Sequence, residues 1–130
     1  MKHRLLLDTQ TFIYAAQEGG SLSAKARAAL LHSGNTLFLS LVSLWEIQIK
    51  LTLGKLKLPT SLPKAVQQAI TEIGIELLPL QADHIYKLTD LPLHHRDPFD
   101  RLLIGQALIE KMVVVGNDLV FDSYGVPRIW

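Results

Sequence analysis

The chain has 130 residues, of which 48% are hydrophobic, and it contains no cysteine. This length and composition predict a single domain over residues 1–130 with a substantial core, and they exclude a disulfide framework and a thiolate metal site. The net charge of +1 does not by itself indicate a nucleic-acid partner. The longest apolar-dominated run, Leu37 to Trp45, is far shorter than the roughly 20 residues that cross a bilayer, so we expect a soluble, cytoplasmic protein without a membrane partner.

Apolar runs and turn residues divide the chain into alternating strands and helices. In chain order we predict a strand at 2–7, a helix at 11–16 ended by Gly19-Gly20, a helix from Ser21 or Ser23 to Leu31, a strand at 36–40, helices at 43–53 and 61–73, a strand at 75–80, helices at 81–91 and 99–111, a strand at 112–115, a helical turn at 119–121 and a strand at 126–130. In the helix at 81–91, Ile85 and Leu88 are expected to face inward.

Two of these strands contain continuous apolar runs. Leu5-Leu6-Leu7 and Val113-Val114-Val115 lack the polar alternation of a strand with one face in water, which is typical of strands covered on both faces. Pro79 indicates that the third strand ends there or lies at an edge of the sheet. The alternation of strands and helices favours an α/β fold with a mostly parallel sheet of four to five strands.

The segment from His95 to Ile104 is a helix start with two carboxylates three residues apart. Asp97 suits the N-cap, because its carboxylate can accept from free backbone N–H groups, and Pro98 suits the first helical position. Asp100 then falls in the first turn. Acids at these positions complement the helix dipole and by themselves need no function.

Three further acids interrupt or end apolar runs. Asp8 and Asp118 follow predicted buried strands, and Glu46 lies one turn into the helix after the second strand. Ligands of open α/β sheets gather at the carboxyl ends of the strands, so these acids and Asp100 can meet at one edge. For Glu46 an alternative is an ordinary surface ion pair with Lys50, four residues later.

Four carboxylates brought together without a counter-ion would repel one another and raise their pKa values. A hard divalent cation resolves this conflict, and an all-oxygen ligand set suits Mg²⁺ or Mn²⁺ that keeps waters and binds phosphate oxygens. Such an ion can lower the pKa of a bound water and polarise a phosphoryl group. The inferred chemistry is phosphodiester hydrolysis, and neutralising these acids would leave a surface that a polyanion can approach.

The adjacent His94 and His95 precede this helix start. Without cysteine or helical H-x-x-x-H spacing they indicate exposed loop histidines more than a transition-metal site.

Four blocks of the sequence resemble the PIN-domain nucleases and, within them, the VapC-type toxins of bacterial toxin–antitoxin modules. In order along essentially the whole chain, the blocks are Leu6-Leu7-Asp8-Thr9; Ser43-Leu44-Trp45-Glu46-Ile47 with Lys50 and Gly54-Lys55-Leu56; Arg96 to Ile104; and Asn117-Asp118 with Phe121 and Tyr124-Gly125. The resemblance implies a three-layer α/β/α sandwich and a Mg²⁺- or Mn²⁺-dependent ribonuclease.

The resemblance also assigns roles to particular residues. Asp8, Glu46, Asp100 and Asp118 become the catalytic acids, with Asp8 and Asp100 as metal ligands and Glu46 and Asp118 ligating directly or through water. Three further residues are auxiliary: Thr9 would help position a metal-bound water, Asp97 would remain mainly a cap, and Asp122 would be an accessory acid.

One position departs from the family pattern. Many relatives carry threonine or serine two residues before the last acid, where this chain has Gly116. The missing hydroxyl is expected to weaken hydrogen bonding around the site. The resemblance further implies a homodimer and an antitoxin partner, whose segment would cover the acidic groove and whose Arg or Lys could displace the metal.

Two other classes of function stay open at this point. A metal-free module that binds RNA or protein would keep the fold and tolerate loss of the acids. Another metal-dependent phosphoesterase, or a nuclease acting on DNA, would need the same four acids, because these define the chemistry and not the sugar.

Overall fold

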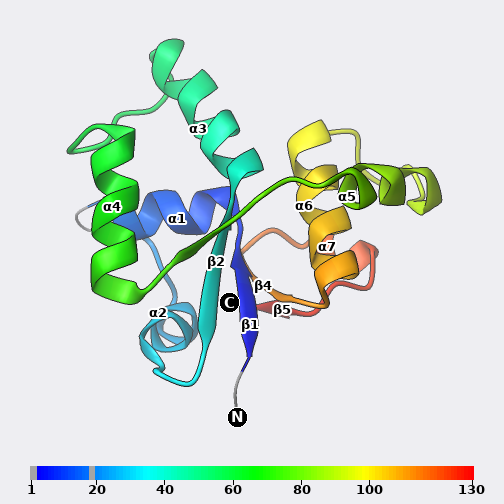
Figure 1. The fold of residues 1–130 in the computed structure, drawn as a ribbon, viewed down its shortest axis with the longest axis horizontal. Helices are drawn as coiled ribbons and strands as arrows, with labels where there is room; N and C mark the ends of the chain where they lie inside the picture. The colour runs from blue at the N-terminus through cyan, green and yellow to red at the C-terminus, as the bar shows by residue number, and fades with distance from the viewer. Residues whose placement is uncertain (1–2, 18–19) are drawn as a thin grey trace.

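A wholly parallel sheet of five strands forms the centre of the computed structural model, which describes residues 3–17 and 20–130 (Figure 1). The strands are β1 (Arg4–Leu7), β2 (Thr36–Ser40), β3 (Glu76–Leu78), β4 (Val113–Val115) and β5 (Arg128–Ile129). Their order across the sheet is β3-β2-β1-β4-β5, so β1 pairs with both β2 and β4. The predicted α/β class and strand number are confirmed, and β3 lies at an edge.

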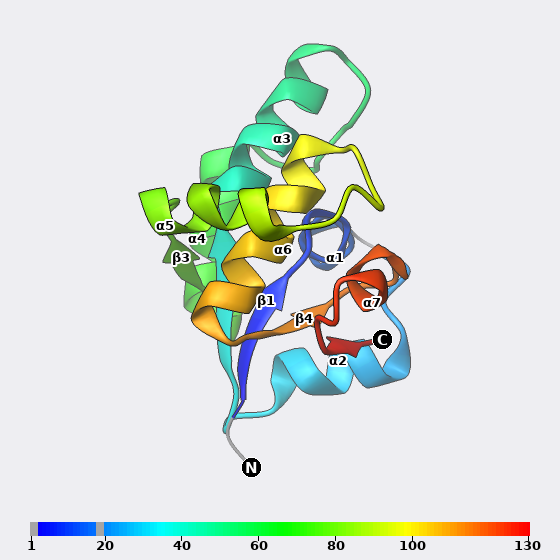
Figure 2. The same ribbon diagram turned by 90° about the vertical axis from the view of Figure 1, so that its right-hand side faces the viewer.

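Helices cover both faces of this sheet. They are α1 (Thr9–Ala16), α2 (Ala24–Leu31), α3 (Leu41–Thr52), α4 (Leu62–Ile73), α5 (Ala82–Tyr86), the 3-10 helix η1 (Lys87–Asp90), α6 (Pro98–Glu110) and α7 (Val120–Ser123). Helices α1, α2 and α4 lie on one side and α5, α6 and α7 on the other, as Figures 1 and 2 show from two directions. This arrangement is the predicted three-layer sandwich.

The central strand β1 divides the apolar core into two clusters. Leu5 and Leu7 pack on the side of α1, where Phe12 is 1% exposed, and Leu6 packs on the opposite side against Ile104 of α6. Successive side chains of a strand point to opposite faces, so a run of three leucines supplies both clusters. This two-sided burial is why the strand carries no polar alternation.

Two helices begin earlier than predicted because a polar residue at the strand end caps them. Asp8 accepts from the backbone N–H of Thr11, so α1 starts at residue 9 rather than 11. Ser40 accepts from the N–H of Val42, so α3 starts at residue 41 rather than 43. In both cases the chain passes from strand to helix without a loop, and a cap of this kind stabilises a helix by about 1 kcal/mol.

The predicted helix at 81–91 is divided into two parts. Helix α5 ends at Tyr86 and continues as the 3-10 helix η1. The inward placement of Ile85 is wrong, because that side chain is 47% exposed and His84 is the buried residue. Lys2 and Gly19, which belonged to predicted elements, lie outside the described residues.

No helix within the described part of the chain combines the length and the apolar character needed to cross a bilayer.

Candidate metal centre

The four predicted acids line one hollow of about 340 Å³ at the carboxyl ends of β1 and β4. Asp8 comes from the junction of β1 and α1, Glu46 from α3, Asp100 from α6 and Asp118 from the loop after β4. In Figure 1, α1 follows the end of β1, and α3 begins where β2 ends. Side chains far apart in sequence therefore share one site.

Asp8 is the most buried of the four acids, with 7% of its surface exposed. Its backbone N–H donates to the Val115 carbonyl at 3.0 Å, which ties it to the end of β4, and its carboxylate accepts from the N–H of Thr11 at 2.8 Å. Burial raises the pKa of the Asp8 carboxyl, and the nearby charges of Asp118 and Glu46 raise it further. The ionised form of Asp8 is thus destabilised by the repulsion expected within a cluster of acids.

The neighbouring Thr9 is also buried, and its hydroxyl donates to the hydroxyl of Ser43 at 3.0 Å. This hydrogen bond joins the first turn of α1 to α3, one helical turn before Glu46. Thr9 lines the hollow as expected, and its immediate structural task is to hold α1 against α3. Ser43 is a residue whose role sequence reasoning missed, although it opens the block that contains Glu46.

Asp97 and Asp100 have the different roles that the sequence suggests. Asp97 caps α6 by accepting from the N–H of Asp100 at 2.9 Å, and only Asp100 lines the hollow. Burial raises the pKa of Asp100 to about 6, the charges of Asp97 and Glu46 act in the same direction, and a hydrogen bond to His95 opposes them. A cation close to Asp100 would therefore stabilise its ionised form.

His95 differs from the exposed loop histidine that the sequence favours. Its Nε2 lies 2.9 Å from Oδ2 of Asp100, and its backbone N–H donates to the Tyr124 hydroxyl at 3.0 Å. Arg101 shapes this loop by donating to backbone carbonyls, among them that of Pro92 at 3.0 Å. Histidine identity alone gives no signal for this contact, because it depends on how the loop returns to the helix start.

Glu46 satisfies both interpretations of its sequence position. Its Oε2 lies 3.2 Å from Nζ of Lys50, so the i,i+4 ion pair forms, and both side chains also line the hollow. Its other oxygen, Oε1, is buried and has no hydrogen-bond partner. An unpaired carboxylate oxygen of this kind needs a ligand to offset its lost hydration.

Asp118 and Asp122 lie in different surroundings. Asp118 is exposed, accepts from the N–H of Val120 at 2.9 Å and lines the hollow. Asp122 forms a two-bond ion pair with Arg128, with Nε to Oδ1 at 3.0 Å and Nη2 to Oδ2 at 3.2 Å, and this hydrogen-bonded partner lowers the pKa of Asp122. The structure does not bring the predicted accessory acid Asp122 into the hollow.

The donor set suits a hard divalent cation. It consists of carboxylates, two of them with raised pKa values and one with an unpartnered buried oxygen. Across residues 3–17 and 20–130, no three acid or histidine side chains stand close enough together to hold one ion directly. A cation that keeps part of its water shell, as Mg²⁺ does, fits such a wider spacing.

An α/β sandwich with an acid cluster at the carboxyl ends of its parallel strands defines the class of this protein. The PIN domain family model matches residues 5–127, and the chain belongs to that family, which is a family of nucleases. A comparison with curated proteins gives no match.

Solved structures share the fold at low sequence identity. VapBC2 from Rickettsia felis, bound to a DNA fragment from its promoter, has 18% identity and a TM-score of 0.69, covering 96% of each chain. DNA-bound VapBC from Salmonella typhimurium has 18% identity and a TM-score of 0.64, covering 97% of this chain and 96% of the other. FitAcB from Neisseria gonorrhoeae has 12% identity and a TM-score of 0.54, covering 95% of each.

Proposed function

We propose that this chain is a Mg²⁺- or Mn²⁺-dependent ribonuclease of the VapC type, the toxin of a toxin–antitoxin pair, acting in the cytoplasm as one domain over residues 1–130. The observation that carries the proposal is the convergence of Asp8, Glu46, Asp100 and Asp118 on one hollow. Membership in a nuclease family supports the chemistry, and the likeness to VapBC structures supports the fold in which it would occur.

In this proposal Asp8 and Asp100 hold the divalent ion, and Glu46 and Asp118 contact it through water. When bound, the ion would supply an activated water and polarise the phosphodiester. Thr9, fixed by Ser43, keeps the first turn of α1 in place beside Asp8. His95 orients the Asp100 carboxylate through the hydrogen bond between Nε2 and Oδ2.

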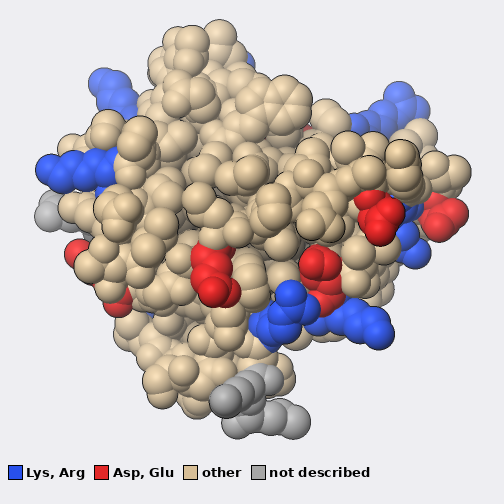
Figure 3. Space-filling view, viewed as in Figure 1, with Lys and Arg blue, Asp and Glu red and all other residues tan. Residues whose placement is uncertain are grey.

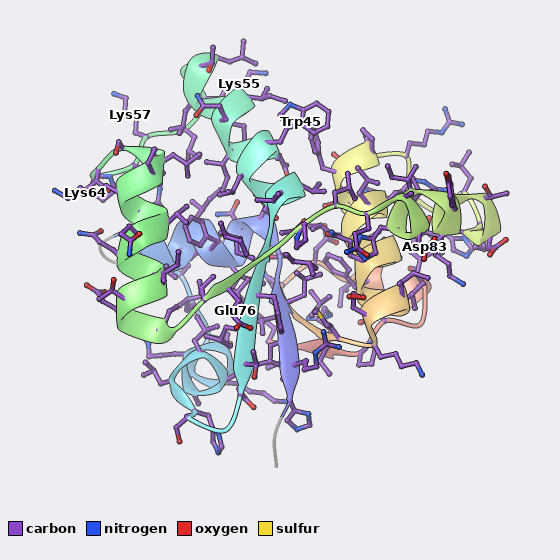
Figure 4. All side chains as sticks on the ribbon, viewed as in Figure 1. Trp45, Lys55, Lys57, Lys64, Glu76 and Asp83 are labelled. Carbon is purple, nitrogen blue, oxygen red and sulfur yellow. The ribbon has the colours of Figure 1, made fainter. Side chains whose placement is uncertain are left out.

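Basic side chains lie near the end of α3 and in the segment that follows it. Lys50 lines the hollow, and Lys55 and Lys57 follow in the segment after the helix, near Lys64 at the start of α4 (Figure 4). Figure 3 shows basic side chains at the upper left of the view and an uncharged area across its upper centre. Lys50 supports contact with a phosphate beside the acids, and the other three lysines lie outside the hollow.

The antitoxin and the homodimer are also proposals. Related folds were solved as VapBC complexes, which favours a partner protein for this chain. A partner segment entering the acidic hollow with an Arg or Lys would pair with the carboxylates and displace the ion. Co-purification with a small protein and loss of cleavage in the complex would support this, and full activity of a saturated complex would count against it.

The test is cleavage of labelled transfer and messenger RNA, and of DNA of matched sequence, by the purified chain with Mn²⁺ and with chelator. Wild type is expected to cleave RNA only with the metal, and Asp100→Asn is expected to lose this activity. Asp122→Asn is the matched control, because that acid lies outside the hollow. Equal cleavage by wild type and Asp100→Asn would reveal a contaminant, and cleavage of DNA alone would assign the site to the other substrate.

A further inference from the structure

Two aromatic residues from opposite ends of the chain line the same hollow as the acids. Tyr14 lies in the last turn of α1, and Trp130 follows β5. Their ring centroids are 6.4 Å apart with an angle of 43° between the planes. Ile129 pairs with Val115, so the end of β5 lies beside the end of β4 and carries Trp130 to the site. Below, Tyr14 and Trp130 together are called the aromatic wall.

The aromatic wall is held in place by packing but is not closed off from solvent. Trp130 is partly buried against the apolar cluster on the α1 side of the sheet, which fixes its ring. Tyr14 is likewise partly exposed. Packing in the core does not require a ring to face a charged hollow. The exposed parts of both rings are therefore available to a ligand that enters the hollow.

Amide side chains stand beside the aromatic wall. Gln10 and Asn117 are exposed and line the same hollow. An amide offers a donor and an acceptor, the pair of groups that recognises base edges. The hollow therefore combines carboxylates for a cation, rings for stacking and amides for hydrogen bonds.

We propose that Tyr14 and Trp130 stack on an unpaired base next to the phosphodiester that the acids cleave, with Gln10 and Asn117 contacting the edge of that base or its sugar. This rests on the proposed function and assigns the residues that would hold the base beside the cleaved bond. A base inside a duplex already stacks on both neighbours and cannot reach the aromatic wall. Aromatic stacking of splayed-out bases is the usual way in which proteins recognise single-stranded RNA.

The first test measures stacking without cleavage. The chain has two tryptophans, so Trp45→Phe leaves Trp130 as the sole tryptophan reporter, and Asp100→Asn in the same chain prevents cleavage. Titration with a short single-stranded RNA is expected to quench this fluorescence saturably, and the same sequence as a duplex is expected to quench it much less. If fluorescence anisotropy shows that the RNA binds while the Trp130 emission stays unchanged, the proposal is overturned. The same result is expected if the aromatic wall serves a protein partner instead of RNA.

The second test uses cleavage kinetics of the otherwise unchanged chain. Trp130→Ala is expected to raise KM by about tenfold with a smaller change in kcat, the range given by the loss of one stacked base. Trp130→Phe is expected to recover most of the loss, and Tyr86→Ala, an aromatic residue that is 69% exposed on α5, is the matched control. An abasic nucleotide beside the cleaved bond should raise the KM of wild type and leave the KM of Trp130→Ala unchanged.

The two proposals fail in different ways. RNA that wild type never cleaves counts against the ribonuclease, and the fluorescence titration still decides whether the aromatic wall binds a base. Cleavage with the same KM in wild type and Trp130→Ala leaves the nuclease intact and overturns the stacking role.

Discussion

The carboxylate of Asp8 lies against the α-carbon of Gly116, in the space that any side chain at position 116 would need. A β-carbon built on Gly116 would lie 2.7 Å from Cγ of Asp8, closer than real β-carbons approach such atoms. Gly116 is buried, and its N–H donates to the Ile129 carbonyl at 3.1 Å, so the backbone has little freedom to retreat. A glycine at position 116 therefore leaves the room that the Asp8 carboxylate occupies in this chain.

Replacing Gly116 is expected to damage the site rather than to restore a lost hydroxyl. In Gly116→Thr or Gly116→Ala the new side chain would push the Asp8 carboxylate from its place, and overpacking of this kind destabilises a protein by about 1–3 kcal/mol. Urea unfolding and cleavage rates measure both effects. If Gly116→Thr cleaves faster than wild type at unchanged stability, the space is not restricted and the hydroxyl is the missing element.

The charge of Asp100 should make the metal-free protein less stable as the pH rises. The pKa of about 6 in the folded chain is above the ordinary value of 3.8, so the folded state binds more protons than the unfolded state in that window. The contribution of Asp100 to stability is then highest below about pH 4 and falls until about pH 6. Because Asp100 is about a quarter exposed, we expect a loss of about 1–2 kcal/mol after allowing for solvent screening.

Asp100→Asn removes this loss, so its free energy of unfolding relative to wild type should increase between about pH 4 and about pH 7.5 in chelator. Added Mn²⁺ should stabilise wild type at the higher pH and leave the variant little changed. A stability difference between the two proteins that does not vary with pH would contradict the assignment of a raised pKa to Asp100.

The sequence predicted the convergence of the four acids on one hollow better than it predicted the contacts of their neighbours. Asp8, Glu46 and Asp118 could be placed because each interrupts or ends an apolar run near a strand end, and parallel strands bring those ends to one edge. Asp122 also follows β4 within a short helix, but Arg128 draws it into an ion pair away from the hollow. No local pattern distinguishes Asp118 from Asp122, because the difference lies in the contact of Asp122 with Arg128 on a later strand.

The same limit explains the other residues that the sequence did not assign. His95 meets Asp100 because Arg101 holds the preceding loop against the helix start. Trp130 reaches the hollow only through the pairing of β5 with β4. Secondary structure followed from periodicity and caps, whereas these contacts depend on loop paths and sheet order that a single sequence does not specify.

Asp97 is expected to contribute to the stability of the fold and not to cleavage. Asp97→Ala removes the cap of α6 and is expected to destabilise the protein by about 1 kcal/mol, whereas Asp97→Asn keeps a capping oxygen and should cost little. Thermal unfolding of both variants measures the difference. A large loss of cleavage in Asp97→Asn at unchanged stability would instead make Asp97 part of the catalytic site.

The hydrogen bond between Thr9 and Ser43 is expected to stabilise the folded protein. Ser43→Ala leaves the buried Thr9 hydroxyl without its acceptor and is expected to lower the free energy of unfolding by about 1–3 kcal/mol. Thr9→Ser retains the hydroxyl and is the matched control. Unchanged urea unfolding of Ser43→Ala would show that this contact does not hold α1 against α3.

Calorimetric titration of Mn²⁺ into the metal-free chain tests most directly whether Asp8, Glu46, Asp100 and Asp118 serve one cation. Wild type and Asp122→Asn are expected to bind the ion alike, and Asp100→Asn and Asp8→Asn are each expected to bind it about tenfold more weakly or not at all. Equal binding by wild type, Asp8→Asn and Asp100→Asn, or no binding by wild type, would contradict the metal centre.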